Sequence, residues 1–331
     1  MGLNIIDDTD TVSLGPSEDG TYKGAMGGTE MMDLALKERV DQKLLDQFNI
    51  IKSRVRKVDE DKPNILWLHD LWNDPESQHL KDPEQRKRFS KLVFVSNWQL
   101  YSYHLALGVP YSESVVIQNA IEPFPFKGKD KDKIRLIYHT TPHRGLEILV
   151  PVFVKLAEHF GDQIELDVFS SFEAYGWKER DKPYEQLFEV CKNHPQINYH
   201  GYQPNAVIRK ALEKAHIFAY PSVWQETSCI AAIEALSAGV KVVCPNFAAL
   251  PETTGGFATM YQWHEDMNEH AHRFMHVLGQ TIQTFIDADV DIINKEMQYQ
   301  KAWADGLYDW DVRKHEWTGL LSAIADQKKS A

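Results

Sequence analysis

Several features that define whole classes of protein are scarce or missing in this sequence. Its 331 residues include three cysteines, Cys191, Cys229 and Cys244, which show neither CxxC nor zinc-site spacing. An odd, sparse set of this kind favours reduced thiols over a disulfide framework. The sequence has no run of about 18 apolar residues, the length that spans a membrane. Its first residues also lack a basic region followed by an apolar stretch. We therefore expect no membrane-spanning helix and no secretion signal, and predict a cytoplasmic protein.

Positive charge is also scarce. The chain carries 36 Lys and Arg residues against 48 Asp and Glu residues, a formal charge of -12. Because binding to a phosphate backbone needs clustered cations, this balance argues against a nucleic-acid partner, while local charge can still hold a small anion. Acidic neighbours dilute the one basic cluster, Arg86-Lys87-Arg88 with Lys91. We therefore expect weak or no membrane association.

What the sequence has in quantity is apolar material, with 43% hydrophobic residues and nine tryptophans. A chain of this length fits two domains of ordinary size. Both halves alternate short apolar strands with helix-length polar segments, which is typical of parallel sheets covered on both faces. The predicted strands are 48–55, 65–69, 91–96 and 114–118 in the first half, and 134–139, 164–170, 197–200, 217–220 and 240–244 in the second.

The stretch PFPFKGKDKDK breaks this alternation with prolines followed by Lys and Asp, and it offers little to pack. It predicts an interdomain linker at 125–133. We expect an α/β fold with one Rossmann-like domain over 1–124, which includes an uncertain first strand near 3–7, and a second over 134–305. A C-terminal helix follows at 306–331, and its return to the first domain stays open. Ligands of such domains bind at the carboxyl ends of the strands, so the active site is expected in a shared cleft.

The most informative segment is PSVWQETSCIAAIEALSAGVKVVCP, residues 221–245. It predicts a turn that carries Glu226, followed by a helix that begins near Thr227 or Ser228, either of which can cap it. A helix start presents free amide groups and the positive end of the dipole, which suits a diphosphate. Glu226 in the loop and Glu234 about two turns along the helix can each accept hydrogen bonds from vicinal hydroxyls. A solvated acidic pair on a surface helix would leave the same pattern.

This segment resembles the E-x7-E signature of retaining glycosyltransferases with the GT-B fold, especially glycosyltransferase family 4, the glycosyl transferases group 1. In that family a PS-x-x-E turn leads into a helix of the form EAlAcG. The resemblance covers about residues 24–325, thinly in the first domain. It implies two Rossmann-like parallel-sheet domains that face a cleft. It also implies that Glu226 contacts the transferred sugar and Glu234 the ribose, with Thr227, Ser228 and Cys229 at the donor.

Three shorter matches extend the resemblance. YHTTPHRGL, 138–146, stands where the family has GRL-x-P-E-K-G, whose two cations neutralise the donor diphosphate. Arg144 takes the Lys position as a permanent cation, whereas His139 departs from the Arg. Gly27-Gly28 resembles the GG-x-E loop, in which glycine lets the backbone approach the donor phosphates or the acceptor. His69, at the end of a strand, stands where the family often has a His that reaches the donor sugar.

Two patterns compete by suggesting a metal. D-x-D triplets hold divalent ions in transferases of the other major fold, and they occur at 8–10, 130–132 and 287–289. None of them directly follows an apolar strand. His272 and His276, near His264 and His270, are spaced as a metal pair without a positioned third ligand. We therefore predict no metal site, and no cofactor beyond the nucleotide-sugar substrate.

The resemblance thus implies a metal-independent glycosyltransferase, with a hexosyltransferase favoured, that moves a sugar from a nucleotide-sugar to an acceptor hydroxyl with retention. Glu226, His69 and Arg144 would be its catalytic residues, and stabilisation of the departing diphosphate would supply much of the catalysis. No second carboxylate stands opposite Glu226, so we expect no covalent intermediate. A sugar-nucleotide epimerase or hydrolase of the same fold, and a catalytically silent nucleotide-sugar binding protein, stay open. The acceptor, whether glycan, lipid carrier or protein, also stays open, with a soluble or carrier-bound one favoured.

Overall fold

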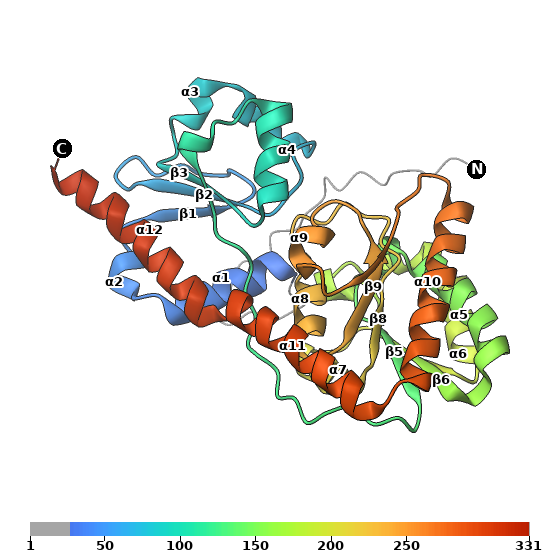
Figure 1. The fold of residues 1–331 in the computed structure, drawn as a ribbon. Helices are drawn as coiled ribbons and strands as arrows, with labels where there is room; N and C mark the ends of the chain where they lie inside the picture. Colours follow the sequence, from blue (N-terminus) through green and yellow to red (C-terminus); the bar gives the residue numbers. More distant parts are fainter. Residues whose placement is uncertain (1–26, 331) are drawn as a thin grey trace.

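The computed structural model describes residues 27–330 and shows two parallel sheets side by side (Figure 1). The expected strand near 3–7 and the triplet 8–10 lie outside the described residues. The first sheet has four strands in the order β1-β2-β3-β4, and the second has six in the order β10-β9-β8-β5-β6-β7. All strand pairs are parallel. The two-sheet α/β architecture that the sequence predicts is confirmed.

The first sheet and its helices lie within residues 28–116. Each residue of β2 is buried, in keeping with the apolar run ILWL that follows its first residue, Asn64. The hydroxyl of Ser96 caps α4 by accepting from Gln99 N, and Gly108 ends that helix with a left-handed φ of 68°. The elements are α1 (Gly28–Arg39), α2 (Gln42–Leu45), β1 (Asn49–Lys52), β2 (Asn64–Leu68), α3 (Pro83–Arg86), β3 (Lys91–Phe94), α4 (Asn97–Leu107) and β4 (Ser114–Val116).

The second sheet and its helices follow from residue 134. The predicted strands are all present, and the structure adds β10, a three-residue strand too short to stand out in the sequence. The elements are β5 (Ile134–Tyr138), α5 (Leu146–Phe160), β6 (Ile164–Val168), α6 (Glu185–Asn193), β7 (Ile197–Tyr199), α7 (Asn205–Lys214), β8 (Ile217–Ala219), α8 (Ile230–Ser237), β9 (Lys241–Pro245), α9 (Leu250–Thr254), β10 (Thr259–Tyr261), α10 (Met267–Asp287) and α11 (Val290–Tyr308).

The last helix, α12 (Trp310–Ser330), leaves the second domain and lies along α1 and α2 beneath the first sheet (Figure 1). Trp317 and Leu321 are buried there, and the Trp317 ring meets that of Trp67 from β2 edge-on at 4.8 Å. Burial of an aromatic side chain of this size stabilises the fold by about 2–3 kcal/mol. The end of the chain therefore completes the core of the first domain. None of the described helices is both long enough and apolar enough to cross a membrane.

The segment between the sheets is better packed than its sequence suggests. Phe124 is buried, and Lys129 is 5% exposed. Lys129 Nζ donates to the backbone carbonyls of Leu212 and Glu213, at 3.1 and 3.0 Å, at the end of α7. The expectation that 125–133 has nothing to pack is therefore wrong, because its lysines bind carbonyls that the helix itself leaves unpaired.

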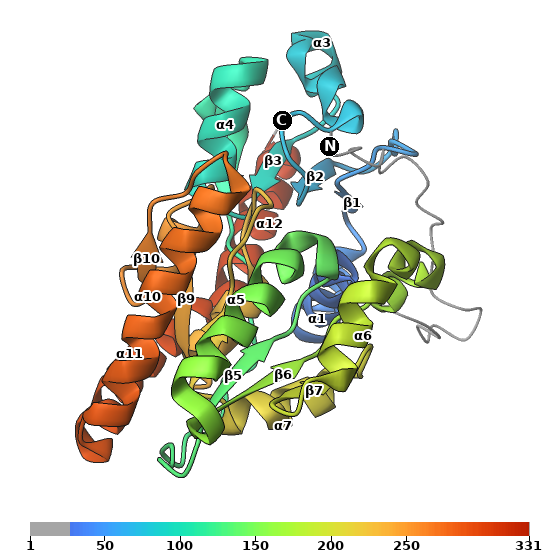
Figure 2. The ribbon, with the colours of Figure 1, turned by 90° about the vertical axis from the view of Figure 1, so that its right-hand side faces the viewer.

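Figure 2 shows α3 and α4 of the first domain above the second sheet and its helices. Polar contacts between α4 and α9 also join the two domains. Glu252, on α9, accepts from the backbone amides of Asn97 and Trp98, both at 2.8 Å, and from Asn97 Nδ2 at 2.9 Å. This carboxylate thereby holds the first turn of α4, where helix amides have no partner of their own.

The second sheet reverses its direction of growth between β5 and β8, because β6 and β7 extend one way and β9 and β10 the other. In open α/β sheets, ligands bind at such a switch point, outside the carboxyl ends of the strands. Gly145 follows β5 at this point, and a Cβ at this position would lie 2.3 Å from the carbonyl oxygen of Pro221, which follows β8. The two loops approach this closely only because residue 145 has no side chain.

Replacing Gly145 by Ala should therefore be strongly destabilising. Its φ of +131° disfavours any side chain, and the contacting atom belongs to backbone that cannot rotate away. We expect a loss of more than about 3 kcal/mol in the free energy of unfolding, measured by urea denaturation.

Gly108→Ala is the matched control for this change. Gly108 also has a positive φ, of +68°, but nothing lies within 4 Å of its added Cβ. Its cost should stay near about 1 kcal/mol. Equal losses in the two variants would show that the contact with Pro221 does not constrain the loops.

Candidate functional site

Two loops form the centre of the candidate site, one on each side of the switch point. The 3₁₀ turn Pro142–Arg144 follows β5, and residues 221–229 follow β8. The Val223 amide donates to the Arg144 carbonyl at 3.3 Å. The ring of Trp224 lies 5.0 Å from that of His143 and 5.9 Å from the Arg144 guanidinium. The structure thus brings together the two segments that carry the strongest sequence signals.

A buried ion pair joins these loops. Arg144 Nη1 and the hydroxyl of Tyr220 both donate to Oε1 of Glu226. The Glu226 side chain is 7% exposed and that of Arg144 21%. Burial opposes the charge on Arg144, but the adjacent Glu226 carboxylate outweighs it and raises the pKa of the guanidinium well above its ordinary value. The guanidinium is therefore held charged, at a point where charge interacts strongly.

The burial of Glu226 corrects one sequence expectation. Because Glu226 and Arg144 are expected in loops beside a cleft, both side chains should be open to solvent, and replacing either should leave the fold intact. Instead, Glu226 is almost fully covered and bound to two side chains. Removing Arg144 would leave a buried carboxylate without its cation, which costs about 3–5 kcal/mol for a fully buried pair.

The histidines of the site are neutral. Burial lowers the pKa of both His69 and His139 to about 3, so their imidazoles carry no charge at neutral pH. His139 packs on the ring of Phe218 at 4.6 Å. At the position where the related motif has a cation, this chain therefore has a hydrogen-bonding group without charge.

The first domain reaches the same loops. Thr227 Oγ1 donates to the backbone carbonyl of His69 at 2.8 Å, and Asn119 Nδ2 donates to that of Ser228 at 3.2 Å. Neither Thr227 nor Ser228 caps α8, contrary to the sequence prediction, because the helix begins later than expected and the Thr227 hydroxyl is engaged across the domain boundary. The helix begins at Ile230, with the buried Cys229 as its N-cap residue and no side-chain cap.

Both predicted glycines lie against the second domain at the start of α1. A Cβ on Gly27 would come within 2.6 Å of the Tyr175 ring, and one on Gly28 would lie 3.0 Å from Ile230 Cδ1 at the start of α8. Because neither glycine has a side chain, the start of α1 can lie against the second domain, with Gly28 next to the start of α8. Glu234 lies further along α8, where it faces α7 and not the Arg144 turn.

Several buried polar atoms around these loops have no hydrogen-bond partner within the described residues. They lie on segments that directly follow strands of both sheets: His69 Nε2, Asn119 Oδ1, His139 Nε2, Thr140 Oγ1, Thr141 Oγ1, His143 Nδ1 and Ser170 Oγ. Leaving such an atom buried and unpaired costs about 1–3 kcal/mol. A cluster of them at strand ends is what a polar ligand would satisfy.

Sequence reasoning missed Tyr220, Tyr175 and Asn119. The signal for Tyr220 is its place as the last residue of the apolar run IFAY, just before the Glu226 turn. Its hydroxyl reaches the Glu226 carboxylate from there. Tyr175 and Asn119 carry no comparable signal. Tyr175 contacts Gly27, which is 148 positions away in the sequence, and Asn119 contacts Ser228, which is 109 positions away.

Four of the side chains that suggested a metal have other partners in the structure. Asp130 binds Arg135, Asp287 accepts from Gln283, and Asp289 caps α11. His270 is buried and bonds to the Tyr261 hydroxyl at 3.0 Å. Over residues 27–328, no group of three His, Cys, Asp or Glu side chains is arranged to hold a metal ion.

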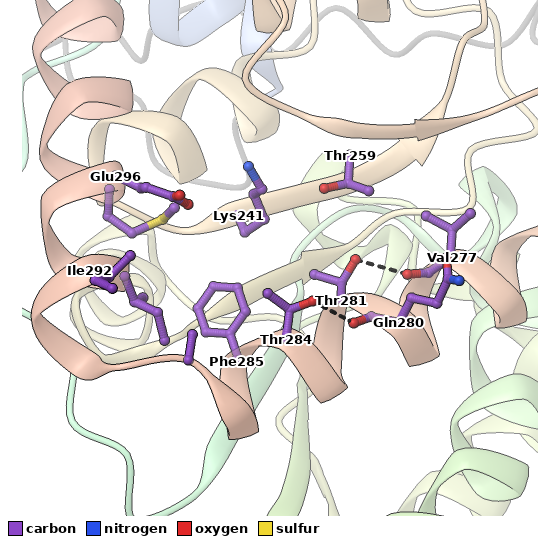
Figure 3. Close-up of a pocket in the computed structure, with 12 residues that line it drawn as sticks. Lys241, Thr259, Val277, Gln280, Thr281, Thr284, Phe285, Ile292 and Glu296 are labelled. Carbon is purple, nitrogen blue, oxygen red and sulfur yellow. Dashed lines mark hydrogen bonds between the residues drawn. The ribbon is translucent and has the colours of Figure 1, made fainter.

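A separate cavity of about 300 Å³ lies between β9, β10 and the helices α10 and α11 (Figure 3). Its charged lining residues are Lys241 and Glu296, and Lys241 Nζ donates to the Phe257 carbonyl at 3.0 Å. Thr281 and Thr284 turn their hydroxyls to carbonyls of their own helix. None of the predicted site residues lines this cavity, so its volume does not make it the reactive site.

Comparison with known sequences finds a match over the part of the chain that carries the Arg144 and Glu226 loops. Residues 118–268 match the family model described as Glycosyl transferases group 1. O-antigen chain mannosyltransferase B of Escherichia coli is 36% identical over 80 residues, which is 24% of this chain and 20% of that protein. The matched region thus spans a fifth of that curated relative.

Solved structures agree over more of the chain. A glycosyltransferase from Rickettsia africae matches with a TM-score of 0.64 and 13% identity, over 90% of this chain and 81% of that one. Anabaena HepE, solved in complex with UDP-glucose, matches with a TM-score of 0.58 and 15% identity, over 79% and 72%. Residues 118–268 thus resemble the glycosyl transferases group 1 family, and the two parallel sheets make the GT-B fold that the sequence predicts.

Proposed function

We propose that the protein transfers a hexose from a nucleotide-sugar to an acceptor hydroxyl, with retention at the anomeric carbon and without a metal ion. The observation that carries this proposal is the group of unpartnered buried polar atoms around the Arg144–Glu226 pair. They belong to both domains and follow the strands β2, β4, β5 and β6. A ligand with many hydroxyl and phosphate oxygens matches such a set.

In this proposal the second domain, 134–305, binds the donor. The diphosphate lies against Arg144 and the free amides at the start of α8, where Thr227, Ser228 and Cys229 bring the backbone to the helix. A guanidinium binds phosphate oxygens in bidentate fashion and keeps its charge at any working pH. The neutral imidazole of His139 adds a hydrogen bond and no charge, so Arg144 carries most of the leaving-group stabilisation.

Glu226 contacts the transferred sugar and Glu234 the ribose. Arg144 and the Tyr220 hydroxyl both donate to Oε1 of Glu226 and orient the carboxylate beside the sugar. Tied to a cation and a phenol, Glu226 is a poor nucleophile, and we propose no covalent intermediate. The first domain, 1–124, presents the acceptor near Gly28 and His69, which already meet the start of α8 and Thr227.

The relatives support a nucleotide-sugar donor, since the matched Anabaena structure holds UDP-glucose and the Escherichia coli relative is named a mannosyltransferase. Identification of the donor comes first, by thermal shift with UDP-, GDP- and ADP-sugars, because a ligand that binds the folded state raises its apparent stability. Release of the nucleoside diphosphate is then measured with and without candidate acceptors. Turnover that needs no acceptor would indicate an epimerase or hydrolase, and binding without turnover a silent binding protein.

Substitutions in the central ion pair should abolish transfer. Glu226→Gln keeps a partner for the Tyr220 hydroxyl, and Arg144→Met removes the cation, so each should lower kcat by about 100-fold or more. The measurement is release of the nucleoside diphosphate, with unfolding followed in parallel to account for the buried pair. Arg56→Met, at an exposed ion pair with Glu76 in the first domain, is the control and should keep wild-type turnover. Near wild-type kcat in either site variant would remove the assignment.

Activity should survive chelation. Since Arg144 and the α8 amides supply the positive potential for the diphosphate, turnover in EDTA should remain within about twofold of the untreated value. Loss of turnover in EDTA that added Mn²⁺ restores would contradict a metal-independent mechanism. The two D-x-D triplets within the described residues would then be the first positions to change.

A further inference from the structure

Arg209, on α7, faces the buried carboxylate of Glu234 and plays no part in the mechanism above. The two side chains form an ion pair with 3.5 Å between Nη1 and Oε1. Glu234 is 9% exposed and Arg209 25%. Asn205, the first residue of α7, also donates to this carboxylate. The Glu234 carboxylate is therefore directed toward the start of α7.

The guanidinium of Arg209 is fixed on its other side by the segment between the two sheets. Its Nη2 donates to the carbonyls of Glu122 at 3.0 Å and Pro123 at 3.4 Å. Its Cζ lies 3.6 Å from the centre of the Phe124 ring, which is itself buried. Cation–π stacking and several directional bonds leave such a group little freedom. Arg209 thus connects Glu234 to residues 122–124 through a side chain that has little freedom to move.

The same segment is tied to the first domain. The carboxylate of Glu122 accepts from Arg39 at the end of α1, and the Arg39 guanidinium lies 5.3 Å from the Trp310 ring of α12. A continuous set of polar contacts therefore runs from α1 through Glu122 and Arg209 to Glu234. The position of this carboxylate depends on how the two domains are joined.

Electrostatics gives Arg209 a second effect on Glu234. Burial raises the pKa of this carboxyl, and the charge of Arg209, with hydrogen bonds from Asn205 and Arg209, opposes the rise. Without the guanidinium the carboxyl would take up a proton more readily. A protonated acid has fewer lone pairs to offer hydroxyl donors than a carboxylate has.

We propose that Arg209 is a positioning residue for the nucleoside part of the donor, holding Glu234 where its carboxylate accepts hydrogen bonds from the vicinal hydroxyls of a pentose. This inference rests on the proposed function, in which Glu234 contacts the ribose, and it adds the residue that holds Glu234 in place. Arg209 acts through Glu234 and leaves the diphosphate, at Arg144, untouched. Its removal should therefore weaken recognition of the sugar hydroxyls selectively.

The test compares ligands that differ only in these groups. The probes are UDP, GDP and ADP, the 2′-deoxy form of whichever binds best, and inorganic pyrophosphate, each titrated by calorimetry against the full chain. Wild-type protein should prefer the ribonucleotide to its 2′-deoxy form by about tenfold. Arg209→Met should weaken ribonucleotide binding by about tenfold, bring that preference close to one, and leave pyrophosphate binding unchanged.

Two further variants separate positioning from general damage. Lys210→Met is the matched control, because Lys210 is the exposed neighbour on α7 and pairs only locally with Glu213. It should bind as wild type does. Arg209→Lys keeps the charge but loses the planar set of guanidinium donors, so its preference for the ribonucleotide over the 2′-deoxy form should be intermediate. This variant also provides a readout if Arg209→Met folds poorly. In a Glu234→Gln background, Arg209→Met should have little further effect on binding.

Each outcome decides between the claims. A wild-type ratio of ribo- to deoxyribonucleotide binding in Arg209→Met or Arg209→Lys would overturn the inference, as would additive effects in the double variant. Equal weakening of pyrophosphate would show that Arg209 supports the fold and not Glu234. A wild-type protein that binds none of the three nucleoside diphosphates would overturn the proposed function itself.

Discussion

The close approach of Gly145 to Pro221 is the constraint on which the site depends. It places the turn after β5 against the loop after β8, so that Arg144 reaches Glu226 across the point where the sheet reverses its order. Any side chain at 145 would separate these loops by displacing backbone. The ion pair that we place beside the donor is thus a product of strand order and of one glycine, and not of the two charged residues alone.

The site is built from two kinds of contact with different origins. Contacts within the second domain join residues that follow neighbouring strands, as with Tyr220, Glu226 and Arg144. Contacts across the boundary, such as Thr227 with His69, come from segments 158 positions apart. The first kind fixes the charged centre, and the second brings residues of the first domain to it.

The sequence predicts the sheets well because their strands contain apolar runs such as ILWL, whose burial follows from composition. It also predicts that Arg144 and Glu226 lie in short loops after strands, where the structure has them. It fails where distant segments decide the outcome. Thr227 was expected to cap a helix, yet its hydroxyl serves a carbonyl of the first domain. The 125–133 segment was expected to be unpacked, yet Lys129 closes the end of α7. Local patterns cannot encode such partners.

Glu252 accepts hydrogen bonds from the first amides of α4, and it thereby links the first domain to the loop that carries Glu226. Glu252 lies three residues after Ala249, whose amide donates to the backbone carbonyl of Glu226 at 3.1 Å. Hydrogen bonds of this type weaken steeply with distance and angle, so separating the two domains would break them. Release of the α4 turn would then remove the external anchor of the backbone that steadies the Glu226 loop. The alignment of the Glu226 carboxylate therefore depends on the contact between the domains, although the two side chains that bind it both lie in the second domain.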